Sequence, residues 1–128
     1  MLDRSATNNG EKCILVADDE PDIIEILQTM LEDAGYKVET TLRGDEVEQL
    51  AEEVQPDLII LDILILGKDG RDLAKSLKSH EKTRHIPILM ISAHPYAEKG
   101  IQEVGDADFL AKPFDMDDLL TRVSNTIQ

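Results

Sequence analysis

Five short, strand-like runs recur along the chain, and each is followed by a helical pattern. Most of the runs are apolar throughout, which is typical of strands that are covered on both faces. Strands that alternate with helices predict a parallel sheet with helices on both sides, so we expect an α/β, doubly wound domain. The runs are Cys13–Ala17, Lys37–Thr41, Leu58–Leu61, Ile86–Ile91 and Phe109–Ala111.

The segments between these runs carry apolar residues at helical spacing. In the first segment, Pro21 suits an opening turn, and Gly35 ends the pattern because glycine accepts a left-handed conformation. The predicted helices are Pro21–Ala34, Asp45–Val54, a segment around Leu73–Leu77, a short and weak one around Tyr96–Val104, and a last one that opens at Asp115.

The 128 residues suffice for one domain. Residues 1–11 are polar and lack the apolar stretch of a signal peptide, so we expect a disordered leader followed by one domain over residues 12–128. No run is long enough to span a membrane. The single cysteine, Cys13, excludes an intrachain disulfide, and we interpret it as a small core residue. These features predict a cytoplasmic protein.

The charge balance restricts the class of partner. The chain has 27 acidic and 13 basic residues, a formal net charge of −14. Binding to nucleic acids or anionic membranes requires basic patches, so the sequence argues against both. A cation or a basic protein surface is compatible with this charge.

Polar residues follow the predicted strands where those strands end. Asp18 and Asp19 follow the first strand, Asp62 the third, Ser92 the fourth and Lys112 the fifth. The carboxyl ends of parallel strands meet at one edge of the sheet, where ligands bind. Carboxylates gathered there repel one another by roughly 4 kcal/mol per pair at 4 Å. A divalent cation such as Mg²⁺, together with the lysine, would offset this repulsion.

Each of these residues also has an ordinary structural interpretation. Asp18 and Asp19 suit the start of the following helix, Asp62 suits a turn, Ser92 suits a loop, and Lys112 suits an exposed surface. The coincidence of all of them at strand ends is what favours a functional site.

Five motifs in the same order resemble the signature blocks of response-regulator receiver domains, and the resemblance runs from about Lys12 to the C-terminus. It implies a flavodoxin-like (βα)5 fold with strand order 2-1-3-4-5. The motifs are Val16–Pro21, Leu61–Ile63, Asp69–Gly70, Ser92–Ala93 and Ala111–Phe114.

The resemblance implies that Asp62 accepts a phosphoryl group from a phosphohistidine. Asp19 and Asp62 would bind Mg²⁺ directly, Asp18 would act through a bound water, and the backbone carbonyl of Leu64 would supply a further ligand. An aspartate is a competent nucleophile when a metal and a cation cradle the phosphoryl group.

The resemblance also assigns roles near the fourth and fifth strands. Ser92 would donate a hydrogen bond to the phosphoryl group and Lys112 would pair with it. The Lys112–Pro113 peptide would be cis. Phe109 would be an aromatic switch that turns inward on activation, although a single aromatic in a short strand is usually a core residue.

The sequence departs from the family pattern in two loops. Leu66 precedes Gly67 where the family usually has a proline. The stretch from Ser92 to Lys112 is shorter than usual, which predicts a short or poorly formed fourth helix. His94 stands where the family tunes dephosphorylation.

The implied partners are a sensor histidine kinase or phosphotransfer protein and a downstream effector protein or domain. A homodimer through the fourth helix, fifth strand and fifth helix is a further expectation.

The chain would catalyse only its own phosphorylation and dephosphorylation. A pseudo-receiver that only binds proteins is the alternative. An Mg²⁺-dependent phosphohydrolase is less favoured because Leu64 stands where a second acid is usual. A nucleotide cofactor is disfavoured because no glycine-rich loop follows the first strand.

Overall fold

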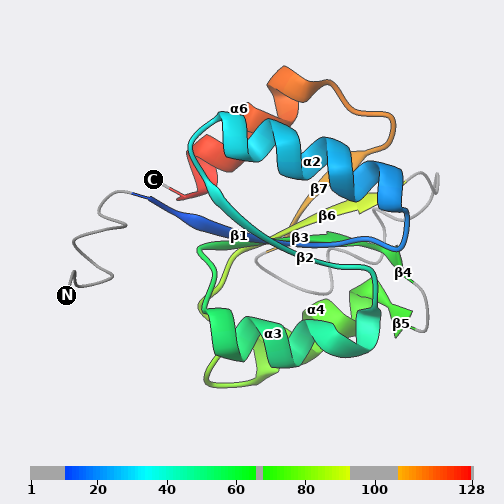
Figure 1. Ribbon diagram of the computed structural model, residues 1–128. Coiled ribbons are helices and arrows are strands. Elements are labelled where there is room, and N and C mark those ends of the chain that lie inside the picture. The colour runs from blue at the N-terminus through cyan, green and yellow to red at the C-terminus, as the bar shows by residue number, and fades with distance from the viewer. Residues whose placement is uncertain (1–10, 66–67, 93–106, 128) are drawn as a thin grey trace.

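The computed structural model describes residues 11–65, 68–92 and 107–127. Its main strands are β1 (Cys13–Ala17), β2 (Lys37–Thr41), β3 (Leu58–Asp62), β6 (Ile88–Ser92) and β7 (Ala107–Ala111). They form one parallel sheet in the order β2-β1-β3-β6-β7, as Figure 1 shows. Numbered along this sheet, the order is 2-1-3-4-5, so the expected doubly wound topology is confirmed.

Helices cover both faces of the sheet (Figure 1). On one face lie α2 (Pro21–Asp33) and α6 (Met116–Ile127), and on the other lie the 3₁₀ turn η1 (Gly44–Glu46), α3 (Val47–Val54) and α4 (Gly70–Ser79). Within the described parts of the chain, none of these helices is both long and apolar enough to cross a membrane.

Alternate residues of the strands supply two separate cores. In β1, Ile14 and Val16 belong to the core beneath α2 and α6, whereas Leu15 and Ala17 belong to the core beneath α3 and α4. All four are fully buried. Because both faces are covered, a strand gains stability from apolar residues at every position, which explains the continuous apolar runs of the sequence.

The helix ends follow the local chemistry of the sequence. Pro21 is the first residue of α2, and Gly35 follows this helix with φ of +100°, a conformation that favours glycine. Asp115 accepts a hydrogen bond from the backbone N–H of Asp117 at 2.8 Å, so it caps α6 as the sequence indicated. Because Pro87 has no N–H for the ladder, β6 begins at Ile88 rather than at Ile86.

Some expectations need correction. The loop after Asp62 contains a short antiparallel hairpin, β4 (Leu64–Ile65) and β5 (Lys68–Asp69). Cys13 is only partly buried, at the first position of β1, and is not a core residue. The weak helix expected around Tyr96–Val104 lies outside the described residues, as does the predicted leader apart from its last residue.

Candidate functional site

Side chains from three strand ends meet at the carboxyl edge of the sheet. Asp18 directly follows β1, Asp62 is the last residue of β3, and Lys112 directly follows β7. The Lys112 Nζ lies 2.9 Å from Asp18 Oδ2 and 3.3 Å from Asp62 Oδ2. The sheet topology therefore unites groups that are 94 and 50 residues apart in the sequence.

The three side chains are held in a nearly closed environment. The Asp18 side chain is fully buried, that of Asp62 is 7% exposed and that of Lys112 is 11% exposed. Backbone N–H groups fix both carboxylates, since Glu20 donates to Asp18 Oδ1 at 2.9 Å and Leu64 donates to Asp62 Oδ1 at 3.2 Å. The carboxylates thus face the ammonium in set orientations.

Glu20 is a member of this cluster that the sequence did not single out. Its Oε2 lies 2.9 Å from the Lys112 Nζ although its side chain is largely exposed. Oxygen atoms of Asp18, Glu20 and Asp62 lie within 4.8 Å of one another. Among the described residues this trio does not include Asp19, which is partly buried beside it in the sequence. The only signal for Glu20 was a third acid after Asp18 and Asp19, which also suits a helix start.

The other candidate residues lie on the same edge or near it. Ser92 is buried at the end of β6, and its carbonyl accepts a hydrogen bond from the Lys112 N–H at 2.8 Å. Phe109, in β7, is partly buried and packs against the core beneath α3 and α4. The side chain of Leu64 is exposed beside Asp62. The Lys112–Pro113 peptide is cis, as the family resemblance implied.

Gly70, the glycine of the Asp69–Gly70 motif, packs directly against the backbone of Asp62 and Ile63. Asp69 caps α4 by accepting a hydrogen bond from the Arg71 N–H at 2.8 Å. Gly70 donates its N–H to the Ile63 carbonyl at 2.6 Å. A β-carbon at Gly70 would collide with the carbonyl oxygen of Asp62 and lie 2.7 Å from the Ile63 Cα. The close approach of α4 to the end of β3 therefore requires glycine.

Burial and charge shift the protonation equilibria of the cluster. Burial and, to a lesser degree, the Asp18 carboxylate raise the pKa of Asp62, the Lys112 ammonium opposes both, and the net pKa is about 6. Burial alone would lower the pKa of Lys112, but its hydrogen bonds to Glu20 and Asp18 outweigh this and raise it. Lys112 is therefore charged, and the cluster carries more negative charge than this lysine neutralises.

This arrangement fits a hard divalent cation. Three carboxylates offer oxygen donors within reach of one small ion, and oxygen is the ligand type that Mg²⁺ prefers. Burial is the main cause of the raised pKa of Asp62, and the Asp18 carboxylate adds to it; a bound cation would offset this second contribution. A carboxylate set between a metal and an ammonium is suited to attack a phosphoryl group.

Replacing Asp62 with Asn should stabilise the metal-free protein by about 2 kcal/mol at neutral pH. The carboxyl has a pKa of about 6 when folded and an ordinary value of 3.8, so it binds its proton more tightly in the folded state. Its contribution to stability therefore falls as pH rises between these values, and the amide has no such loss. Urea unfolding across this pH range, with a chelator present, measures the difference.

The matched control is Glu25→Gln, which neutralises an exposed carboxylate in α2 and should change stability by less than about 0.5 kcal/mol. If Asp62→Asn were less stable than the parent at neutral pH, the hydrogen bonds from Lys112 and Leu64 would outweigh the cost of burying the charge beside Asp18, contrary to this account.

The comparisons with known proteins all indicate the same family. A family model described as the response regulator receiver domain matches residues 14–124. The DNA-binding dual master transcriptional regulator RpaA of Synechocystis is 39% identical over 112 residues, which cover 86% of this chain and 46% of RpaA. The response regulator PleD of Caulobacter vibrioides is 38% identical over 112 residues, with 86% and 25% covered. The chain thus spans half or less of these two relatives.

Solved structures share the fold. The chemotaxis response regulator CheY4 of Vibrio cholerae has a TM-score of 0.83 and 30% identity, covering 91% of this chain and 98% of that one. The receiver domain of the sensor histidine kinase PA1611 of Pseudomonas aeruginosa has a TM-score of 0.84 and 26% identity, with the same coverage of both chains. That structure carries a magnesium ion coordinated in its active site cleft.

Proposed function

Since the chain belongs to the response regulator receiver family, we propose that it accepts a phosphoryl group from a phosphohistidine onto Asp62, with Mg²⁺, and thereby switches a protein-interaction surface in two-component signalling. The observation that carries the proposal is the contact of Lys112 with both Asp18 and Asp62 in a buried cluster that fits a divalent cation. The Lys112 ammonium and a bound divalent cation would offset the negative charge of an incoming phosphoryl group.

Asp62, Lys112 and Ser92 have separate roles in the proposed transfer. With a pKa of about 6, Asp62 is largely ionised at neutral pH, so a carboxylate oxygen can attack phosphorus while the bond from phosphorus to the histidine nitrogen breaks. Lys112 then moves from carboxylate partners to a phosphoryl oxygen, and the Ser92 hydroxyl donates to another. Because Asp62, Lys112 and Ser92 already lie at the same edge of the sheet, the transfer requires movement of side chains but not of the strands.

Mg²⁺, when bound, would neutralise charge on the phosphoryl oxygens during transfer. We assign Asp62 and Asp19 as direct ligands, Asp18 as a ligand through water, and the Leu64 carbonyl as a further ligand. Glu20 is a further candidate, because its carboxylate oxygen lies within 4.8 Å of oxygens of Asp18 and Asp62.

The proposed partners follow from the same role. A sensor histidine kinase or a phosphotransfer protein would supply the phosphoryl group, and an effector protein or domain would respond to it. Phe109 is proposed as the switch residue between the site and that response, and a homodimer through the face that includes β7 and α6 is one form of output. A cytoplasmic setting, a domain that begins at residue 12, and a role for His94 in dephosphorylation stay predictions.

Acetyl phosphate with Mg²⁺ should add one phosphoryl group to the protein, and Asp62→Asn should abolish the addition. The amide keeps the shape of the side chain but is no longer a nucleophile, whereas removal of Mg²⁺ by a chelator should suppress labelling of the parent protein. Intact-mass spectrometry at several reaction times measures both effects.

Asp57→Asn is a suitable control because Asp57 is an acid at the opposite end of β3, where it accepts a hydrogen bond from the Cys13 N–H. It should be labelled like the parent. Equal labelling of the Asp62→Asn protein would refute the assignment of the phosphoacceptor. A parent protein that binds its partners but is never labelled would instead support the pseudo-receiver alternative.

A further inference from the structure

The β4–β5 hairpin that follows Asp62 packs closely against the η1 turn. Across the hairpin, Ile65 of β4 pairs with Lys68 of β5. Gly44, the first residue of η1, lies against both of them: a β-carbon on Gly44 would lie 2.8 Å from the Cβ and the Cγ of Lys68 and 3.1 Å from the Cγ2 of Ile65. No step of the proposed transfer uses this contact.

Space, rather than backbone conformation, requires a glycine at position 44. The φ of Gly44 is not positive, so other residues can adopt its backbone conformation. The optimal separation of two carbon atoms that are not bonded is about 3.5–4.0 Å, well above the 2.8 Å that an added carbon would have here. The Cβ of Lys68 is fixed by the backbone, so a rotation of the side chain cannot remove the overlap. A methyl group at position 44 would force either η1 or the hairpin to move.

The η1 turn is firmly anchored to the rest of the domain. The hydroxyl of Thr41, buried at the end of β2, accepts a hydrogen bond from the Arg43 N–H at 3.1 Å and donates one to Glu46 Oε1 at 2.7 Å. Val47, which follows η1, is fully buried in the core beneath α3 and α4. The hairpin has only two residues in each strand. We therefore expect a side chain at position 44 to move the hairpin rather than η1.

A movement of the hairpin would reach the phosphoacceptor through the backbone of Leu64. The Leu64 N–H donates to Asp62 Oδ1 at 3.2 Å, and the Leu64 carbonyl is a proposed metal ligand. Leu64 directly precedes Ile65, so a shift of Ile65 away from η1 displaces Leu64 as well. We propose that Gly44 is a positioning residue for the reaction at Asp62, because the space beside it sets the position of the Leu64 backbone. This inference rests on the proposed transfer to Asp62.

Replacing Gly44 with Ala should slow the labelling of Asp62 by acetyl phosphate about tenfold at saturating Mg²⁺. It should also raise the Mg²⁺ concentration for half-maximal labelling about tenfold, because the Leu64 carbonyl would be displaced from the proposed ion. Intact-mass spectrometry over a series of Mg²⁺ concentrations measures both effects, and circular dichroism shows that the variant is folded. In a protein that stays folded, a loss of stability alone leaves this Mg²⁺ dependence unchanged.

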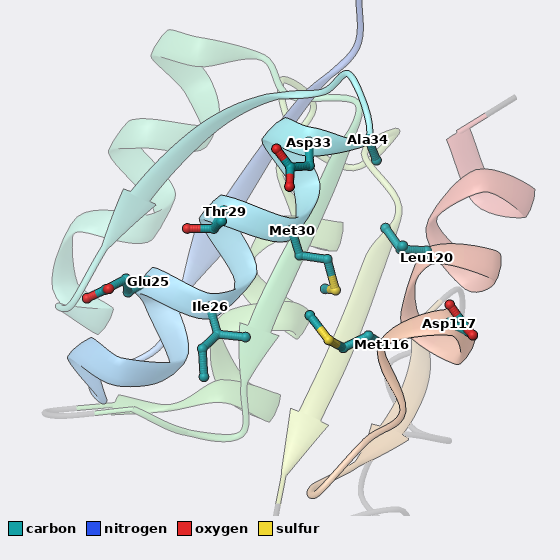
Figure 2. Close-up of a pocket in the computed structure, with 9 residues that line it drawn as sticks. All are labelled: Glu25, Ile26, Thr29, Met30, Asp33, Ala34, Met116, Asp117 and Leu120. Carbon is teal, nitrogen blue, oxygen red and sulfur yellow. The ribbon is translucent and has the colours of Figure 1, made fainter.

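A second measurement requires neither the metal nor a phosphoryl donor. In a ¹⁵N-labelled protein with a chelator present, Gly44→Ala should move the amide resonance of Leu64, because its hydrogen bond to Asp62 changes. Met30 and Met116 point toward each other in a groove between α2 and α6, on the other face of the sheet, so their methyl resonances should not respond (Figure 2). A Leu64 resonance that stays in place, or labelling like that of the parent, would overturn the proposal.

Changes at Lys68 test whether the hairpin contact is the cause. Lys68→Gly removes both atoms that lie 2.8 Å from the added carbon, so Gly44→Ala should change the labelling rate less than about twofold in this background. Lys68→Ala removes the same charge but keeps the Cβ, so there Gly44→Ala should still slow labelling severalfold. Equal slowing in both backgrounds would overturn the proposal. If Gly44→Ala alone does not fold, Lys68→Gly should restore both folding and labelling, and a double variant that folds but is labelled slowly would also overturn it.

The role of Gly44 and the transfer to Asp62 can fail separately. If the parent is labelled on Asp62 and Gly44→Ala behaves like the parent, only the role of Gly44 fails. If the parent is never labelled, but Gly44→Ala moves the Leu64 resonance and Lys68→Gly returns it, the transfer to Asp62 fails and the control of the Leu64 backbone by Gly44 stands.

Discussion

Replacing Lys112 with Met should destabilise the metal-free protein by about 3 kcal/mol at neutral pH. The Lys112 ammonium lies 2.9 Å from the fully buried Asp18 and 3.3 Å from Asp62, and methionine fills similar space without the charge. Two buried carboxylates then face each other unneutralised, with a repulsion on the order of 4 kcal/mol at 4 Å. Urea unfolding followed by circular dichroism, with a chelator present, measures the loss.

The pH dependence identifies the cause of that loss. The ammonium lowers the pKa of Asp62, so its removal should raise this pKa above its present value of about 6. Because the folded state then binds the proton more tightly than the unfolded state, the loss is greatest above the new pKa and shrinks as pH falls through it. Added Mg²⁺ should restore part of the lost stability at neutral pH, since it supplies the missing positive charge.

Lys82→Met is the matched control. The Lys82 Nζ lies 3.9 Å from Glu52 on the surface, where both side chains are exposed, so its removal should cost less than about 0.5 kcal/mol at any pH. Equal losses for the two lysine variants would show that methionine itself, rather than the unpaired buried carboxylates, lowers the stability.

Replacing Gly70 with Ala should cost about 2 kcal/mol of stability and slow the phosphorylation of Asp62. The added methyl group meets the backbone of Asp62 and Ile63, and backbone atoms cannot turn aside as a flexible side chain can. Either α4 moves away and lengthens the bond from the Gly70 N–H to the Ile63 carbonyl, or the end of β3 shifts. The second response displaces Asp62 from Lys112, and the first weakens the hydrogen bond that holds the backbone beside Asp62 in place. Urea unfolding and the rate of labelling by acetyl phosphate measure the two effects.

Gly35→Ala gives a useful comparison because Gly35 has open space around its Cα but a φ of +100°. Its replacement should cost about 1 kcal/mol through backbone strain and leave the rate of labelling unchanged. A Gly70→Ala protein that loses stability but is labelled at the normal rate would contradict the idea that Gly70 positions Asp62.

The sequence predicted the sheet and the convergence of acids and lysine because both follow from topology. Parallel strands place Asp62 and Lys112 on one edge whatever the details of the loops. Glu20 was missed because its long, exposed side chain reaches Lys112 through a rotamer that no sequence pattern specifies. The same limit applies to Asp19, whose predicted role as a direct metal ligand depends on a side-chain orientation.

Two other features could not be predicted from the sequence, for different physical reasons. The strands β4 and β5 have two residues each, too few for any periodicity to show. Helical spacing assigned the apolar residues of α2 to one buried face, so Ile26 fell outside the pattern. The packing of α2 beside α6 is tertiary information that helical spacing does not contain.

β7 lies at one edge of the sheet, and this position determines how the Lys112 contact can transmit a movement. Within the described parts of the chain β7 pairs only with β6, so it can move without breaking a described ladder on its other side. Lys112 directly follows β7, yet its side chain ends beside Asp18 and Asp62, which follow β1 and β3 further inside the sheet. Lys112 therefore links the centre of the sheet to one of its edge strands. When the charge beside Asp18 and Asp62 changes, we expect the contacts of Lys112 with these residues to change. We expect the resulting displacement to appear in β7.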